Sequence, residues 1–171
     1  MKNFHFIPVE DLKTLDKLIK WVRPQGLDYP NWDIWIDKTY FEILNGYKQA
    51  IILEVNGNVM GDAISQPHKE NGLLYEFKNL RVNSELWDFG CGYFLAKQVE
   101  KYARKNFHGI ICDLRSSEKN VYSFLLRIGY VPLGERFLYD ECNPDTIMIK
   151  TFDKKTEAGI IYKSKELILG N

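Results

Sequence analysis

The sequence predicts a mixed α/β (α+β) fold, with a mostly antiparallel central sheet of about six or seven strands flanked by about four helices. Three observations lead to this class. Segments with the two-residue period of a strand alternate with segments with the 3.6-residue period of a helix. An Asn-Gly dipeptide lies between two apolar runs, which is typical of an antiparallel hairpin. The 171 residues are also enough for one hydrophobic core without disulfides or a structural metal.

The N-terminal third predicts one short strand and two helices. Residues 4–8 alternate like a strand, and residues 10–23 carry apolar side chains at helical spacing until Pro24 ends the pattern. A loop rich in Pro and Gly follows. A second helix is predicted in residues 32–46, with an apolar face and Gly46 as its stop. The apolar face of this helix is formed by Ile36, Tyr40, Ile43 and Leu44.

The middle of the chain predicts an antiparallel meander. Residues 50–55 and 59–65 are apolar runs joined by the Asn56-Gly57 turn. A second turn at residues 67–72 leads into a long third strand at residues 73–82.

The C-terminal half predicts a helix that begins at a pair of glycines, then a buried strand at residues 109–114 and a helix at residues 118–128. Two closing strands follow, within residues 130–140 and 145–152. The side chains expected to face inward on the helix are Val121, Phe124, Leu125 and Ile128. We therefore expect one domain at residues 1–152 and a C-terminal extension at residues 153–171 whose place the pattern does not define.

Composition narrows the classes of partner. The 23 basic residues balance the 23 acidic ones, so net charge favours neither nucleic acid nor an anionic membrane as a partner. The three cysteines show no metal-like pairing, and two of them lie in apolar segments, which suits a reducing compartment. The N-terminus has no signal-peptide core or membrane-spanning run. We expect a cytoplasmic protein without a metal, as a monomer or homodimer.

Gly90 and Gly92 stand at the mouth of a helix, directly after a strand and a short polar loop. The pair either makes a tight turn or seats a phosphate. The first turn of a helix carries unpaired N–H groups and a partial positive charge that suit a pyrophosphate. Glycine at these two positions lets the backbone come close to such a group. The sequence lacks the third glycine of a Rossmann fingerprint and the Gly-Lys-Ser/Thr ending of a P-loop.

The order of elements and this glycine pair resemble the GNAT superfamily of acyl-CoA-dependent N-acetyltransferases, over nearly all of residues 4–152. The family's cofactor motif is Arg or Gln, two free positions, Gly, one free position, then Gly or Ala. Residues 87–92 (WDFGCG) match both glycines, but Trp87 stands where Arg or Gln is usual. Residues 80–82 (LRV) are similar to the end of the family's fourth strand, and residues 124–130 (FLLRIGY) to its late helix and the Gly-aromatic step after it.

The resemblance implies acetyl-CoA as the donor and direct transfer of its acetyl group to a primary amine of a peptide or a small molecule. The pantetheine arm is expected along the strand end, where a backbone amide can stabilise negative charge on the thioester oxygen. The pyrophosphate is expected at the glycine turn. The cofactor-binding residues predicted in this way are Leu80, Arg81, Val82, Phe89, Gly90, Cys91, Gly92 and Tyr93.

Amine acetylation needs a proton acceptor, because a free alkyl amine is mostly protonated at neutral pH. Glu76 lies six residues before Val82, the spacing at which some family members place a catalytic glutamate. The alternative for Glu76 is a solvent-facing carboxylate paired with Lys78. Asp62 and Glu54 are further carboxylates on neighbouring strands.

The family's general acid is a tyrosine four residues before the glycine that ends the late helix. Leu125 occupies that position here and cannot donate a proton. Tyr122, one helical turn earlier, is the substitute we consider, and the alternative is that Tyr122 and Tyr130 are packing aromatics.

The acceptor in this family is set mainly by the segment between the first two helices. Here that segment offers Tyr29, Trp32 and Trp35 for an aromatic pocket, and Asp28 or Asp33 for a cationic amine. The same aromatics could instead pack the loop onto the sheet. An alternative function follows from Trp87 and the missing tyrosine: a non-catalytic CoA-binding or regulatory module with the same fold.

Overall fold

The structure is a computed structural model, and it describes residues 3–26, 29–139 and 141–170. Its seven strands are β1 Phe4–Pro8, β2 Gln49–Val55, β3 Asn58–Pro67, β4 Leu74–Val82, β5 Gly109–Arg115, β6 Val131–Arg136 and β7 Asp145–Thr151. Its longer helices are α1 Leu12–Val22, α2 Trp32–Leu44, α3 Cys91–Ala103, α4 Lys119–Arg127 and α5 Glu157–Ser164. Short helical turns are η1 Arg23–Gln25, η2 Ser84–Phe89 and η3 Lys165–Leu169.

The strands form one sheet in the order β1-β2-β3-β4-β5-β7-β6. The pairs β1–β2, β2–β3, β5–β7 and β6–β7 are antiparallel, and β4 and β5 are parallel. The predicted mixed, mostly antiparallel sheet is therefore confirmed. Contacts between residues divide the molecule into two compact units. The first consists of residues 1–66 and 78–99, and the second of residues 67–77 and 100–171.

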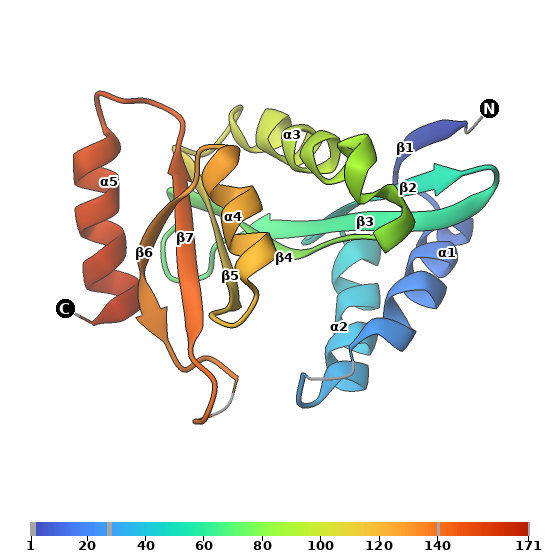
Figure 1. Ribbon diagram of the computed structural model, residues 1–171, viewed down its shortest axis with the longest axis horizontal. Coiled ribbons are helices and arrows are strands. Elements are labelled where there is room, and N and C mark those ends of the chain that lie inside the picture. The colour runs from blue at the N-terminus through green and yellow to red at the C-terminus, as the bar shows by residue number, and fades with distance from the viewer. Residues whose placement is uncertain (1–2, 27–28, 140, 171) are drawn as a thin grey trace. The chain divides into compact units, whose positions relative to one another are not determined.

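The first unit has helices on both faces of its strands. Figure 1 shows α1 and α2 on one face of β2 and β3, and the first part of α3 on the other. The predicted hairpin joins β2 to β3, with Asn56 at φ 50° and Gly57 at φ 84°. Two successive residues with positive φ are the requirement of the tight hairpin turn that Asn-Gly favours. The core under α1 and α2 consists of Leu15, Leu18, Val22, Ile36, Ile43, Ala50, Ile52 and Ile64.

The two N-terminal helices follow the predicted spacing closely. Asp11 caps α1, because its carboxylate accepts from the amide of Thr14 at 2.8 Å. Helix α2 buries Ile36 and Ile43 as predicted. The prediction for Leu44 is wrong, since this side chain is exposed and Thr39 is buried in the inner face instead. The helix carries apolar side chains on both faces, so its periodicity alone defines the inner face poorly.

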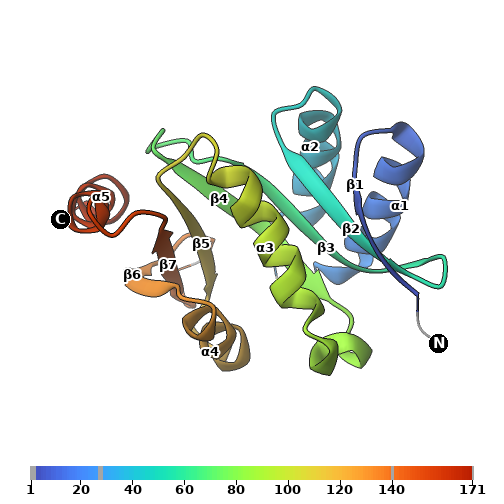
Figure 2. The ribbon, with the colours of Figure 1, turned by 90° about the horizontal axis from the view of Figure 1, so that it is seen from above.

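In the second unit, β5, β7 and β6 form an antiparallel group, with α4 and α5 on opposite sides of it (Figure 2). The start of β4 joins this group through three parallel pairs with β5, from Leu74–Gly109 to Glu76–Ile111. On α4, Leu125 is buried as predicted, whereas Val121 is exposed and its predicted inward position is wrong. Val121 is the third residue of α4, and the buried residue of this helix is Leu125.

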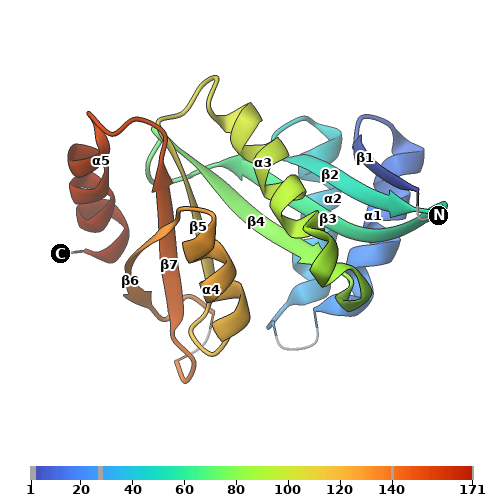
Figure 3. The ribbon, with the colours of Figure 1, turned by 45° about the horizontal axis from the view of Figure 1, so that its top comes forward.

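Residues 153–171, which the sequence left unplaced, supply α5 and η3 within the described residues. Ile160 and Ile168 are buried in a second core cluster with Leu74, Ile111, Leu133, Ile147 and Ile149. The guanidinium of Arg136 donates to the carbonyl of Ile168 at 2.6 Å, and a Cβ added at Gly134 would meet Leu169 at 2.5 Å. Figure 3 shows the red C-terminal helix beside β6 and β7. The extension thus completes the core of the second unit.

Candidate functional site

A glycine turn links η2 to α3 in the first unit. Gly90 has φ 69°, a left-handed conformation that favours glycine. The first backbone hydrogen bond of α3 runs from the amide of Phe94 to the carbonyl of Gly90, at 3.1 Å. The amides of Gly92 and Tyr93 precede this bond, and the first turn of α3 has no acidic side chain. This end of α3 therefore suits an anion.

Aromatic contacts fix the glycine turn to β1. The ring of Phe89 lies 5.7 Å from that of Phe4, and the ring of Phe94 lies 6.0 Å from that of Phe6, between centroids. The predicted cofactor residue Phe89 is thus also a support for the turn. The sequence pattern missed this support, because residues 4–8 carry no signal of what lies across from them.

The end of β4 has one backbone edge directed away from β3. The amide of Asn83 donates to the carbonyl of Met60 at 2.8 Å, which turns the backbone groups of Asn83 toward β3. Backbone groups alternate in direction along a strand, so those of Leu80 and Val82 point toward the opposite edge. The ladder with β5 ends at Glu76–Ile111. Leu80 and Val82 therefore present the backbone edge that the sequence predicted for a pantetheine arm.

Trp87, the departure from the family motif, contacts this same edge. Its side chain is exposed, at 66% of its surface, and the indole Nε1–H donates to the carbonyl of Val82 at 3.1 Å. The residue that replaces an Arg or Gln thus closes the η2 turn onto the last residue of β4.

Arg81, between Leu80 and Val82, is directed elsewhere. Its Nε donates to Asn79 Oδ1 at 3.0 Å, and its Nη1 donates to the carbonyl of Gln25. The guanidinium also lies 5.1 Å from the centroid of the Trp32 ring. Leu80, Arg81 and Val82 were all predicted to bind the cofactor. The side chain of Arg81 instead contacts residues next to the segment between α1 and α2.

Two carboxylates considered from the sequence have partners within the first unit. Asp62 is fully buried and accepts from Trp21 Nε1 at 2.9 Å and from Asn79 Nδ2 at 2.7 Å. Burial raises the pKa of Asp62 to about 6, against the smaller opposing effect of these hydrogen bonds. Glu54 forms an ion pair with Lys17 at 2.7 Å.

The three predicted acceptor aromatics lie together. Trp32 and Trp35 stack at 4.7 Å between centroids, with 19° between their planes, and Tyr29 lies 6.0 Å from Trp32. The two tryptophans also pack against the first core cluster. Asp33 pairs with Arg23 at 2.7 Å, and Asp28 lies outside the described residues. The two tryptophans therefore pack the start of α2 onto the core, and they remain partly exposed to solvent.

The catalytic candidates belong to the second unit. Glu76 is half-buried on β4, and its charge helps to raise the pKa of the buried Cys112 thiol, after the larger effects of burial and Asp113. Tyr122 is half-buried in the first half of α4. Tyr130 is buried with a hydroxyl that has no hydrogen-bond partner among the described residues, and burial raises the pKa of this phenol well above its usual value. Tyr130 is thus placed as a packing aromatic would be, and Tyr122 stays the candidate acid.

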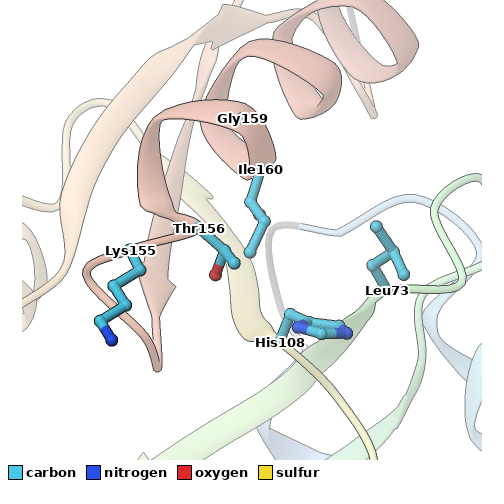
Figure 4. A pocket seen from close by; sticks show the side chains of 6 residues that line it. All are labelled: Leu73, His108, Lys155, Thr156, Gly159 and Ile160. Carbon is cyan, nitrogen blue, oxygen red and sulfur yellow. The ribbon is translucent and has the colours of Figure 1, made fainter.

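A separate hollow of about 340 Å³ opens at the start of α5 (Figure 4). The side chains of Thr156 and Ile160 point into it toward His108. None of the residues predicted for the cofactor, the acceptor or catalysis lines this hollow.

Comparison with solved structures identifies proteins with a similar fold. A protein of Desulfovibrio desulfuricans assigned to the GNAT family of acetyltransferases superimposes with a TM-score of 0.72, at 14% identity over 88% of this chain and 99% of that one. The fold is that of the GNAT acetyltransferases. A second GNAT-fold structure, assigned as an acetyltransferase from Salmonella typhimurium and solved with acetyl-CoA, gives 0.67 at 14% identity, over 90% of this chain and 95% of that one. The ribosomal-protein-S18-alanine N-acetyltransferase of Escherichia coli gives 0.66 at 15% identity, over 88% and 94%.

At the level of sequence alone, no protein-family model and no curated protein matches this GNAT-fold chain. In the part of the chain that the structure describes, no cluster of three or more His, Cys, Asp or Glu side chains could hold a metal ion. No helix among the described residues is long and apolar enough to cross a bilayer.

Proposed function

We propose that this protein is an N-acetyltransferase that transfers an acetyl group directly from acetyl-CoA to a primary amine of a peptide or a small molecule. One observation carries the proposal: in a GNAT fold, the outward backbone edge of Leu80 and Val82 leads into a glycine turn at the N-terminus of α3.

The residues present fit acetyl-CoA. The pyrophosphate would be held by the first-turn amides of α3 at Gly92 and Tyr93, next to the left-handed Gly90. The pantetheine arm would pair with the backbone of Leu80 and Val82, as an added strand pairs with an open edge. The carbonyl of Val82 already accepts from Trp87, so an arm amide would compete for that acceptor.

When bound, acetyl-CoA supplies an acetyl group activated as a thioester. The amide of Leu80 is suited to stabilise negative charge on the thioester oxygen. The acceptor amine must be neutral to attack, and we assign the removal of its proton to Glu76, directly or through a water. The half-buried position of Glu76 leaves part of its surface accessible.

The departing thiolate needs a proton or must leave as an anion. Leu125 is buried in the position where the family has tyrosine, so any proton must come from another donor. We assign this role to Tyr122, on the preceding turn of the same helix. Water is the competing donor, and a Tyr122→Phe variant with unchanged turnover would favour it.

The acceptor would bind beside Tyr29, Trp32 and Trp35. Because the Escherichia coli enzyme of the same fold acts on an alanine of a ribosomal protein, a peptide with a free N-terminal amine is the first acceptor to test. Small primary amines are the second.

A second candidate function is a CoA-binding module without turnover, favoured by the buried Leu125 and by the contact of Trp87 with Val82. The two functions share the cofactor site and differ in the chemical step. An enzyme releases free CoA only when a suitable amine is present, whereas a binding module releases none.

The test begins with calorimetric titration of the purified protein with acetyl-CoA, and with NADH as a control nucleotide. We expect selective binding of acetyl-CoA near one equivalent. A panel of peptide and small-molecule amines is then screened for thiol release. Equal or absent binding of both nucleotides would overturn both functions, and binding without thiol release across the panel would favour the module.

A further inference from the structure

Five residues of the first unit form a closed ring of hydrogen bonds. Trp21 donates from its indole to Asp62 at 2.9 Å, and Asn79 donates from its side-chain amide to the other oxygen of Asp62 at 2.7 Å. Arg81 donates to Asn79 at 3.0 Å and to the carbonyl of Gln25. The side chain of Gln25 closes the ring by donating to the carbonyl of Trp21 at 2.6 Å.

The ring joins four elements: α1, η1, β3 and β4. A fully buried carboxylate is costly unless hydrogen bonds compensate for lost water, and each oxygen of Asp62 has one such donor. A hydrogen-bond network whose members all have partners holds them in place, and the bonds of this ring are partly buried from solvent. The ring therefore fixes Gln25, at the beginning of the segment between α1 and α2, to the strand that carries Leu80 and Val82.

Arg81 extends this attachment to Trp32. The guanidinium lies 5.1 Å from the centroid of the ring, and the indole of Trp32 donates to the carbonyl of Arg23 at 3.0 Å. Gly26 lies so close that an added Cβ would fall 2.0 Å from the Trp32 ring, which leaves room only for glycine. Arg81 is thus in contact with both ends of the segment that precedes α2.

Alternate residues at the end of β4 face the two proposed binding sites, one for the cofactor and one for the acceptor. The backbone groups of Leu80 and Val82 point to the edge proposed for the cofactor, while the side chains of Asn79 and Arg81 hold the segment proposed for the acceptor. A displacement of about 1 Å between reacting groups can lower the rate about 100-fold. A rigid connection between the two sites therefore has a direct consequence for catalysis.

We propose that Arg81, with Asn79 and Asp62, is a positioning residue that fixes the acceptor-binding segment relative to the thioester, without touching either substrate. This role rests on the proposed acetyltransferase function. It predicts that loss of Arg81 weakens use of the acceptor amine while binding of acetyl-CoA persists.

The test compares Arg81→Met with Arg136→Met. Arg136 also donates to a backbone carbonyl, that of Ile168 in η3 of the second unit. For Arg81→Met we expect kcat/KM for the best amine of the panel to fall about 10- to 100-fold, mainly through kcat, with unchanged acetyl-CoA affinity. For Arg136→Met we expect lower thermal stability with no change in kcat. Arg81→Lys keeps the charge but cannot donate to Asn79 and Gln25 in the same fork geometry, so its kcat should lie between those of wild type and Arg81→Met.

Hydrogen exchange supplies a readout that needs no acceptor. The amide of Tyr29 donates to Gly26 at 3.1 Å and that of Trp35 to Asn31 at 3.0 Å. We expect both amides to exchange faster in Arg81→Met and to be unchanged in Arg136→Met. Unchanged exchange, or an acetyl-CoA affinity reduced as much as acceptor use, would overturn the positioning role. Failure of the proposed function would look different, because the wild-type protein itself would then bind no acetyl-CoA or release no thiol.

Discussion

The indole nitrogen of Trp87 donates a 3.1 Å hydrogen bond to the carbonyl of Val82, so the residue that replaces the family's usual Arg or Gln engages the backbone edge proposed for the cofactor. This contact must break if a pantetheine amide takes the same acceptor. The exposed position of Trp87 makes such a movement inexpensive.

We expect Trp87→Arg to bind acetyl-CoA about tenfold more tightly, since it removes the competing donor and adds a charge that favours phosphate. Calorimetric titration measures the change, and Trp87→Phe separates the two causes because it removes the donor without adding charge. Weaker binding in Trp87→Arg would show that the indole supports the bound cofactor. In the wild-type protein, acetyl-CoA should also change the indole fluorescence, and this change should disappear in Trp87→Phe.

Gly92 tests the phosphate seat directly. Gly92→Glu places a negative side chain in the first turn of α3 and should abolish acetyl-CoA binding, because the carboxylate repels the pyrophosphate. Gly159→Glu is the matched control: Gly159 also lies in the first turn of a helix, and an added Cβ there meets no atom within 4 Å. Calorimetry should show wild-type affinity for the control. An unchanged affinity in Gly92→Glu would refute our placement of the site.

Local patterns predicted most of the fold. The Asn56-Gly57 turn, the glycine before α3 and the spacing of Leu15, Leu18 and Val22 each act within a few residues, so their signals lie in short stretches of sequence. Helix α5 was not predicted, because its inward residues Ile160 and Ile168 define a face only against the distant strands β6 and β7.

Some parts of the candidate site could likewise be predicted from the sequence, and others could not. The glycine turn has a local signal in the sequence, whereas the backbone edge of Leu80 and Val82 was expected from the resemblance to the GNAT superfamily. The ring around Asp62 joins residues up to 60 positions apart, from Trp21 to Arg81, and no local pattern signals it. Its members could be found only once β3, β4 and α1 were placed together.

Ile160 tests the contribution of the C-terminal segment to stability. Ile160→Ala removes a side chain that is 5% exposed and should lower the free energy of unfolding by about 2–4 kcal/mol, through lost burial and the cavity left behind. Tyr162→Ala is the control on the same helix, since Tyr162 is 72% exposed and its loss should change stability by less than about 0.5 kcal/mol. Chemical denaturation measures both. Equal effects would mean that α5 does not contribute to the core of the second unit.

Asp62 makes a contribution to the free energy of unfolding that decreases as the pH rises in the acidic range. Burial raises the pKa of Asp62 from 3.8 to about 6, so between these values the folded protein holds a proton that the unfolded chain has lost. The contribution of this group is fully present below about pH 4 and is lost as the pH rises through about 6, by on the order of 3 kcal/mol. Arg81, the charged group that acts on Asp62, opposes the rise in pKa only in part.

The measurement is the free energy of unfolding of wild type and Asp62→Asn, by denaturant titration at several pH values between about 4 and 7. Other carboxylates titrate alike in both proteins, so the difference between the two curves isolates Asp62. We expect wild type to lose stability relative to Asp62→Asn as the pH rises, with most of the change complete above about pH 6. A constant difference across this range would mean that Asp62 titrates near its ordinary pKa, and that its hydrogen bonds from Trp21 and Asn79 offset the cost of burying its charge.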